Sequence, residues 1–262
     1  MKKTMNKFSL NDRKAVITGG CGLIGREIVT GMALAGAKVY IVDINKGLGA
    51  KLARELKNKG ASAEFIHLDI TDLENIESKI GDIFEDYGPI DIWVNNAYPR
   101  TKDWGAKVEE VSVKSWQKNV DLHLNSYALC SKYAAEQMRP TGGSIINMGS
   151  IYGVLGADFT VYEGTGMTMP FAYSAIKGGI VNLSRYLASY FGKYNVRVNT
   201  ICPGGVYDKQ DPKFIRNYER KTLLKRMARP DEVASVAVFL ASEAASYITG
   251  ATIMVDGGWS AV

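Results

Sequence analysis

The sequence has few cysteines, and it has no long apolar run. Its three cysteines, Cys21, Cys130 and Cys202, are odd in number and far apart, which fits neither a disulfide framework nor a zinc site. We therefore expect no metal and a reducing, cytoplasmic location. Met1–Lys7 is polar and basic with no apolar stretch after it, which predicts no signal peptide. No run reaches the roughly 18 apolar residues that a membrane helix needs, so no membrane partner is expected.

A strong excess of charge is also absent. The chain has 32 basic and 27 acidic residues, a formal net charge of +5 spread along its length, which argues against nucleic acid as a partner. Basic residues are densest between positions 213 and 229. Two interpretations stay open for them: a solvated helix face, or a lid at about 207–229 that attracts an anionic substrate or cofactor phosphates.

Strand-like and helix-like patterns alternate along the chain. Short apolar runs predict strands at 14–18, 38–43, 64–68, 90–95, 143–148, 195–201 and 251–255. Helical periodicity lies between them, at 24–35, 47–58, 73–87, 116–138, 172–190 and 231–240. This alternation predicts an α/β fold with helices on both faces of a parallel sheet. Because no linker or repeat interrupts it, we predict a single doubly wound Rossmann-like domain over 1–262, with about seven strands.

A glycine-rich segment, TGGCGLIG at 18–25, follows the first predicted strand and precedes a helix. Glycines there allow a tight turn and a close approach to a pyrophosphate at the helix N-terminus. Asp43 ends the second predicted strand, where a carboxylate can accept bonds from ribose hydroxyls. Asp69 and the segment Asn95-Asn96-Ala97 end the next two strands, at the sheet edge where ligands bind. The alternative is a loop that merely caps a helix, with a chance acid beyond it.

Tyr173 and Lys177 stand at i and i+4 of a predicted helix, so they share one face. A free phenol has a pKa near ~10, and a fixed positive charge nearby favours the phenolate. This makes Tyr173 a candidate proton carrier near neutral pH. Alone, the pair would more often be a surface tyrosine and lysine, but the glycine loop favours the catalytic interpretation.

Together, the segments TGGCGLIG, LDIT, NNA, INMGS, YSAIK and RVNTICPGGV resemble the short-chain dehydrogenase/reductase family over nearly the whole chain. The resemblance implies an NAD(P)-dependent oxidoreductase that interconverts a secondary alcohol and a ketone, assembled as a homotetramer or homodimer. It implies that Ser150 polarises the substrate oxygen, that Tyr173 carries the proton, and that Lys177 binds the nicotinamide ribose and lowers the pKa of Tyr173. The cofactor-binding residues that it implies are Gly19, Cys21, Gly22, Leu23, Ile24, Gly25, Asp43, Ile44, Asp69, Ile70, Asn96, Ala97, Tyr173, Lys177, Pro203, Gly204 and Val206.

The sequence departs from this family in four places. The TGxxGxxG spacing is similar to the extended branch, although the chain length and the YSAIK motif favour the short form. Tyr98 stands where glycine is usual. His123 stands where the family has a fourth catalytic residue, an asparagine, and we expect its backbone carbonyl to hold a water near Lys177. Ser150 and Tyr173 are also farther apart than usual, which predicts an active-site insertion at about 154–171.

The insertion predicts a polar substrate. It must overhang the site because catalytic residues lie at both ends, and it mixes hydrogen-bonding side chains with glycines. We expect Tyr152 and Glu163 on this side, and Tyr98 and Arg100 on the opposite rim, to contact a sugar or sugar phosphate. The segments NNAYPRT and YEGTGMTMP also resemble a flagellin-modification-like branch of bacterial surface-sugar oxidoreductases. An oligomer contact is the alternative for the insertion.

The end of the second strand predicts the cofactor. Asp43 accepts from a ribose hydroxyl and repels a 2′-phosphate, and Ile44 follows it with no arginine nearby. NAD is therefore expected in preference to NADP, unless Arg26 reaches around to bind the phosphate.

Two other functions stay open at this point. A catalytically weak cofactor sensor or scaffold is favoured mildly by His123 and opposed by the intact Ser150, Tyr173 and Lys177. An epimerase or dehydratase is suggested only by the glycine spacing, and the chain length opposes it.

Overall fold

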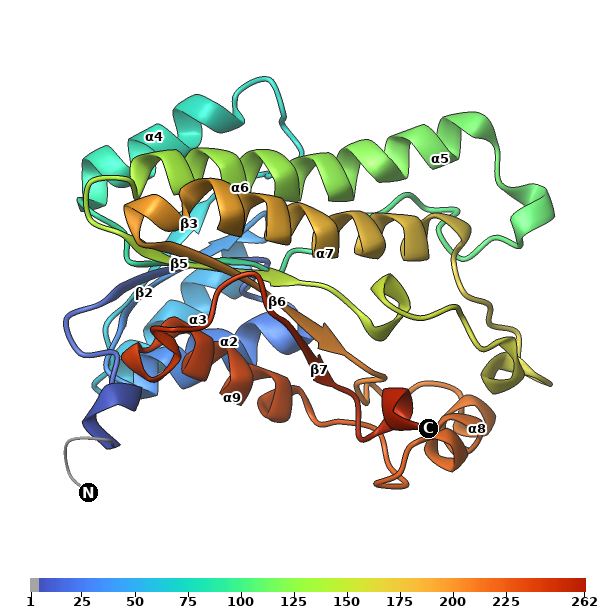
Figure 1. Ribbon diagram of the computed structural model, residues 1–262. Helices are drawn as coiled ribbons and strands as arrows, with labels where there is room; N and C mark the ends of the chain where they lie inside the picture. Colours follow the sequence, from blue (N-terminus) through green and yellow to red (C-terminus); the bar gives the residue numbers. More distant parts are fainter. Residues whose placement is uncertain (1–4) are drawn as a thin grey trace.

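The computed structural model describes residues 5–262, so part of the stretch Met1–Lys7, on which the expectation of no signal peptide rests, lies outside the described residues. Within them, one parallel sheet has the strand order β3-β2-β1-β4-β5-β6-β7 (Figure 1). This confirms the predicted doubly wound α/β fold. The strands are β1 (Lys14–Thr18), β2 (Lys38–Asp43), β3 (Ala63–His67), β4 (Ile92–Asn95), β5 (Gly143–Met148), β6 (Val196–Pro203) and β7 (Thr252–Val255).

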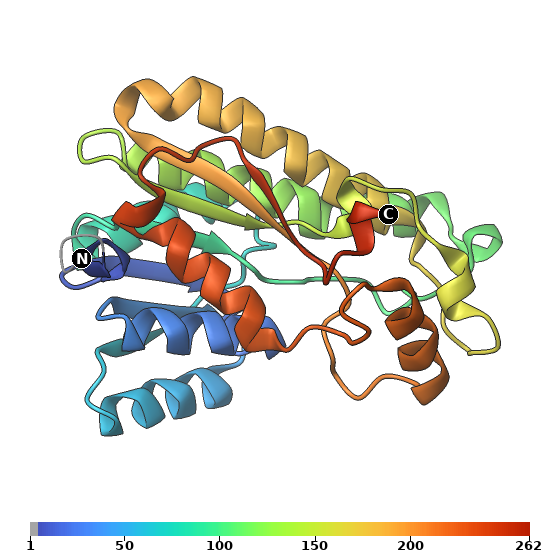
Figure 2. The ribbon, with the colours of Figure 1, turned by 60° about the horizontal axis from the view of Figure 1, so that its bottom comes forward.

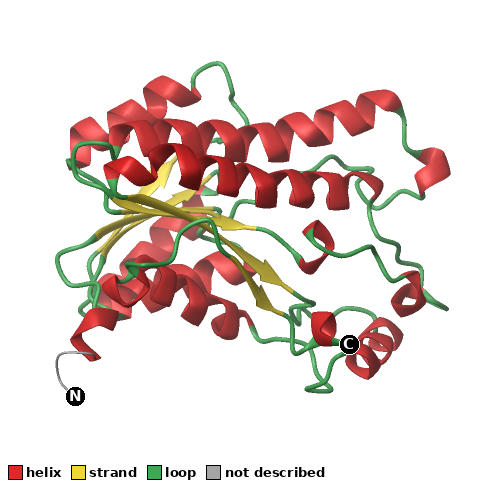
Figure 3. Ribbon diagram, viewed as in Figure 1, coloured by secondary structure: helices red, strands yellow, loops and turns green. Residues whose placement is uncertain are grey.

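Helices cover both faces of this sheet, which explains why the central strands are apolar almost throughout. On one face lie α2 (Leu23–Leu34), α3 (Lys46–Asn58) and α9 (Pro230–Ala241), and on the other lie α4 (Ile76–Tyr87), α5 (Val113–Asn119), α6 (Ser126–Gln137) and α7 (Phe171–Phe191). Figure 3 shows the sheet between these two helical layers. Each layer packs its own cluster of buried side chains against the strands. None of the helices in residues 5–262 is long and apolar enough to cross a membrane.

A third, smaller apolar cluster lies beyond the carboxyl ends of the strands. It joins the predicted insertion, which contains η5 (Phe159–Tyr162), to α8 (Pro212–Lys221) from the predicted lid (Figure 2). Lys221 pairs with Asp158 at 2.9 Å, and Asn217 Nδ2 donates to the backbone carbonyl of Glu163 at 3.2 Å. The insertion and the lid segment are therefore packed together over one edge of the sheet.

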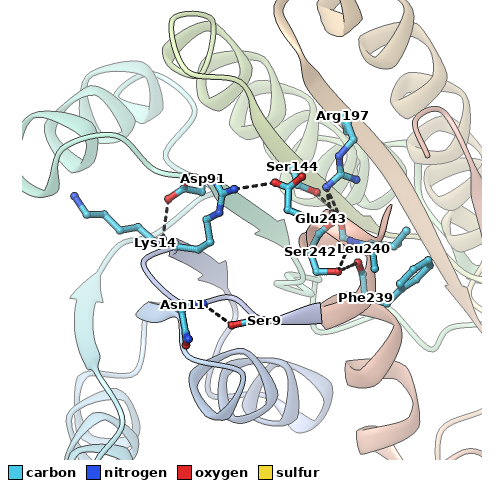
Figure 4. A network of polar contacts seen from close by, with 12 residues as sticks. Ser9, Asn11, Lys14, Asp91, Ser144, Arg197, Phe239, Leu240, Ser242 and Glu243 are labelled. Atoms are coloured by element: carbon cyan, nitrogen blue, oxygen red, sulfur yellow. Dashed lines mark hydrogen bonds and ion pairs between the residues drawn. The ribbon is translucent and has the colours of Figure 1, made fainter. Parts of the chain in front are cut away.

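The opposite edge, where the strands begin, is closed by a polar network (Figure 4). Arg13, just before β1, donates to Asp91 and to Glu243, each at 2.8 Å. Arg197 on β6 donates to the carbonyl of Leu240 at 2.8 Å. These contacts tie the strands to the end of α9 and leave the carboxyl edge of the sheet for ligands.

Candidate active site

The glycine loop between β1 and α2 has a backbone that only glycine can provide. Gly19 has φ +63°, and a Cβ on it would lie 2.5 Å from Ala97 Cα. A Cβ on Gly25 would overlap the Gly19 carbonyl oxygen. Asn96 Nδ2 donates to that same carbonyl at 3.0 Å, so the segment after β4 buttresses the loop. No side chain caps α2, which leaves its N-terminal N–H groups free for a phosphate.

A crevice of about 940 Å³ extends from this loop to Tyr173 and Lys177. Every predicted cofactor-binding residue lines it except Cys21 and Gly25. The Cys21 N–H donates to Asp43, and burial raises the pKa of its thiol to about 12, so the side chain is an inert filler. Gly25 acts through the close approach described above. Asp208 and Gln210, which sequence reasoning missed, add the start of the lid segment to the lining.

Asp43 is held rigidly at the end of β2. Its carboxylate accepts from the N–H of Cys21 at 3.0 Å and from that of Asn45 at 2.9 Å. Arg26, the cation that could have offset its charge, donates to Glu55 at 2.5 Å. The adenosine end of the crevice therefore presents a fixed carboxylate and no free arginine from α2.

Ser150, Tyr173 and Lys177 come together at the other end of the crevice. Tyr173 and Lys177 are one turn apart near the start of α7, and Ser150 follows β5. Burial raises the pKa of Tyr173, and the Ser150 hydroxyl partly offsets this. Ser150 Oγ also accepts from the N–H of Tyr152 at 3.2 Å. The structure therefore brings the three residues together at one end of the crevice.

Lys177 is 4% exposed, and its Nζ donates to the carbonyl of Met148 at 2.7 Å. Burial lowers the pKa of its ammonium to about 7. The imidazole Nε2 of His123 lies 3.3 Å from the same Nζ.

The predicted helix at 116–138 is not continuous. A π-helical turn, η3 (Val120–Asn125), separates α5 from α6 and carries His123 at its centre. The helix is therefore irregular at His123, and Ser126 Oγ donates to the His123 carbonyl at 3.0 Å. The expectation that this carbonyl also holds a water stays a prediction. The imidazole, not the carbonyl, faces Lys177.

Tyr98, in the place of the usual glycine, forms a partition between the cofactor crevice and a second cavity. Its hydroxyl accepts from Trp104 Nε1 at 2.8 Å, and its ring meets that of Tyr173 edge-on at 6.1 Å. Arg100 lies over the outer face of the Tyr98 ring, 4.9 Å from its centroid. Trp104 was missed from the sequence, where nothing distinguishes it from other aromatic residues in a loop.

The second cavity, of about 490 Å³, opens onto Ser150 and Tyr173. Its walls are mainly aromatic, and no acidic or basic side chain is among its lining residues. Apart from Tyr173, the aromatic lining residues are Tyr98, Trp104, Tyr152, Tyr162, Phe214 and Tyr218.

Two of the four residues predicted to contact the substrate line this second cavity, and two do not. Tyr98 and Tyr152 line the second cavity, but Glu163 is exposed outside it and Arg100 lines the cofactor crevice instead. Val161 of the insertion is buried, with Tyr162 and Met169 packed beside it, whereas Phe159 is exposed and Asp158 pairs with Lys221. No lysine or arginine of the basic segment lines either cavity, which favours its interpretation as a solvated face.

A dinucleotide crevice that ends at a serine, a tyrosine and a lysine defines a nucleotide-dependent oxidoreductase. Residues 22–260 match a family model described as "Enoyl-(Acyl carrier protein) reductase". The chain is 34% identical over 253 residues to the post-translational flagellin modification protein A of Campylobacter coli, covering 95% of this chain and 99% of that protein. It is 31% identical over 259 residues to a cyclopentanol dehydrogenase of Comamonas testosteroni, covering 96% and 98%.

Solved structures agree with these similarities. A gluconate 5-dehydrogenase from Burkholderia cenocepacia, in complex with NADP and tartrate, superimposes with a TM-score of 0.88 at 27% identity, covering 98% of this chain and 99% of that one. The chain belongs to the short-chain dehydrogenase/reductase family. It is an oxidoreductase that acts on CH–OH groups with a nicotinamide dinucleotide.

Proposed function

We propose that the protein is an NAD-dependent dehydrogenase that interconverts a secondary alcohol and a ketone on an uncharged, ring-shaped substrate of sugar-like polarity. The aromatic cavity next to Ser150 and Tyr173 carries this proposal. Aromatic walls pack against the C–H faces of a ring, and hydroxyls on Tyr162 and Thr168 supply polar contacts. A phosphate would be desolvated there without a cation, so the sugar-phosphate alternative is disfavoured.

The proposed chemistry follows from the positions of the side chains. A nicotinamide held by Lys177, Pro203 and Val206 at this end of the crevice would supply the hydride chemistry at the substrate carbon. The Ser150 hydroxyl donates to the substrate oxygen and holds it beside Tyr173. Tyr173 then takes the alcohol proton during oxidation, or returns it to the ketone oxygen during reduction. The charge on Lys177 favours the phenolate form of Tyr173 when proton transfer occurs.

The proposed preference for NAD rests on the adenosine end of the crevice. The Asp43 carboxylate can accept from ribose hydroxyls and repels a 2′-phosphate. Arg26 is engaged by Glu55 and is not among the residues that line the crevice. The exposed Ile44 side chain that follows Asp43 adds no charge.

Assembly and location stay predictions. A homodimer or homotetramer packed through the long helices would cover Tyr186 and Tyr190 on α7, whose rings are stacked and exposed. Sedimentation of the purified protein measures the assembly, and fractionation of the source cells measures the cytoplasmic location.

A panel of alcohols tests the function, with turnover followed by the absorbance of NADH. Cyclic alcohols and uncharged sugars should be oxidised with a higher kcat/KM than linear alcohols, steroids or sugar phosphates. Tyr173→Phe is the control that removes the proton carrier while preserving packing, and its turnover should fall by ~10²–10⁴-fold. Tight NADH binding without turnover of any alcohol would instead support the cofactor sensor, and a preference for sugar phosphates would refute the uncharged substrate.

A further inference from the structure

The backbone around His123 is built to turn its side chain inward. The π-helical turn η3 lies between two ordinary helical segments, and Ser126 Oγ bridges two successive carbonyls, those of Leu122 at 2.7 Å and His123 at 3.0 Å. Turns of this kind are rare and occur mostly at functional sites. The carbonyls of this turn are thus satisfied within the helix, and only the imidazole of residue 123 extends toward α7.

The imidazole is fully enclosed. His123 is 0% exposed, and the rings of Tyr98 and Tyr127 lie at 5.2 and 5.1 Å from it. Its Nε2 lies 3.3 Å from Lys177 Nζ, and its Nδ1 has no hydrogen-bond partner among the described residues. The only charged group recorded against the ring is therefore the Lys177 ammonium.

Hydrogen-bond chemistry then fixes the state of the histidine. While Lys177 is protonated its ammonium only donates, so Nε2 must present its lone pair and the proton must sit on Nδ1. Burial and the Lys177 charge also hold the pKa of His123 well below its usual range, which keeps the ring neutral. The Nδ1–H has no hydrogen-bond partner among residues 5–262.

We propose that His123 is a positioning residue that holds the Lys177 amine through its Nε2 lone pair, replacing the carbonyl-bound water that the sequence suggests. The Lys177 ammonium has three N–H groups. Met148 O and His123 Nε2 accept from two of them, so the third is left for a ribose hydroxyl in the crevice. The kinetic part of this inference rests on the proposed function, but the structural part does not.

The structural part can be tested without turnover, because the chain has only two histidines, His67 and His123. Long-range ¹H–¹⁵N correlation spectra of histidine-labelled protein report the tautomer of each ring. We expect His123 to keep a proton on Nδ1 and an unprotonated Nε2 from pH 6.5 to pH 5.5, where Lys177 is protonated. Lys177→Met should shift the His123 Nε2 signal, and the exposed control Lys57→Met should not. A proton on Nε2, or a spectrum unchanged by Lys177→Met, would overturn the proposal.

Two variants of His123 test the functional part. Glutamine keeps an acceptor near the position of Nε2, and leucine removes it at similar volume. We expect His123→Leu to lower kcat/KM and NADH affinity by about 10–100-fold, the usual worth of a hydrogen bond to a charged group. His123→Gln should recover most of this loss and the wild-type pH profile. Wild-type behaviour of the leucine variant, or equal losses in both variants with unchanged melting temperatures, would overturn the assignment. If the leucine variant does not fold, the spectroscopic measurement of the His123 tautomer alone tests the proposal.

Discussion

Burying the charged side chain of Lys177 lowers the unfolding free energy of the protein. Its ammonium is buried without a carboxylate, and burial lowers its pKa from 10.5 to about 7. Between these two values the unfolded chain binds a proton at Lys177 that the folded protein does not. Unfolding free energy then rises with pH, because stability increases wherever the unfolded state holds more protons. Below pH 7 both states are protonated and the full cost of burying the charge remains.

Lys177→Met removes this titration and keeps the length of the side chain. One pKa unit corresponds to ~1.4 kcal/mol, so the wild type should gain about 3 kcal/mol over the variant between pH 7 and pH 9.5. In a chain of this size that equals a relative shift of about 6–12 °C in melting temperature. The variant also lacks the hydrogen bonds of Lys177 to Met148 and His123. Their loss lowers its unfolding free energy by a similar amount at every pH, so it does not produce the rise with pH.

The assay is chemical unfolding of both proteins, free of cofactor, at several pH values from 6 to 9.5. Other groups titrate in both proteins and cancel in the difference. The difference should be flat below pH 7 and should grow in favour of the wild type above it. Parallel stability curves across the whole range would refute a buried, uncompensated ammonium.

The remaining predictions concern the two cavities and the glycine loop. Asp43→Ser should reduce the preference for NAD over NADP by about 10-fold or more in calorimetric titrations, and an unchanged ratio would contradict the role of the carboxylate. Gly25→Ala should weaken cofactor binding and cost about 1–3 kcal/mol in thermal unfolding, because its Cβ has no room, whereas Gly81→Ala, with open space around it, should do neither. Glu163→Ala should leave KM unchanged while Tyr98→Ala raises it, and the reverse result would restore the acid as a substrate contact.

The features that could be predicted from the sequence are those set by neighbouring residues. Apolar runs gave the strands because both faces of a parallel sheet are buried, and i, i+4 spacing placed Tyr173 and Lys177 together. The observed ends of helices differ from the predicted ends where a local hydrogen bond sets the first residue. The helix predicted to begin at 116 starts at Val113, because Ser112 Oγ accepts from the Ser115 N–H and caps it.

The substrate cavity could not be predicted in the same way. Trp104, Tyr162 and Phe214 lie on separate loops and on α8, and they become one wall only when the insertion packs against the lid segment. Composition does not say which side of a loop faces inward, so it could not place Glu163 relative to this cavity. Val161, two residues earlier, is fully buried, whereas Glu163 is exposed.

Two of the departures from the family pattern occupy one cluster. The Tyr98 ring lies 5.2 Å from His123, 6.1 Å from Tyr173 and 5.7 Å from Lys177 Nζ. A glycine at position 98 would leave the imidazole of residue 123 open to the crevice, where water could solvate the lysine. The tyrosine excludes that water, and the imidazole supplies the acceptor that the water would have provided. Because residues in contact do not act independently, each substitution is best understood as compensating for the other. Lys177 is therefore shielded from water and lies beside the aromatic cavity, at the carboxyl edge of the nucleotide-binding sheet.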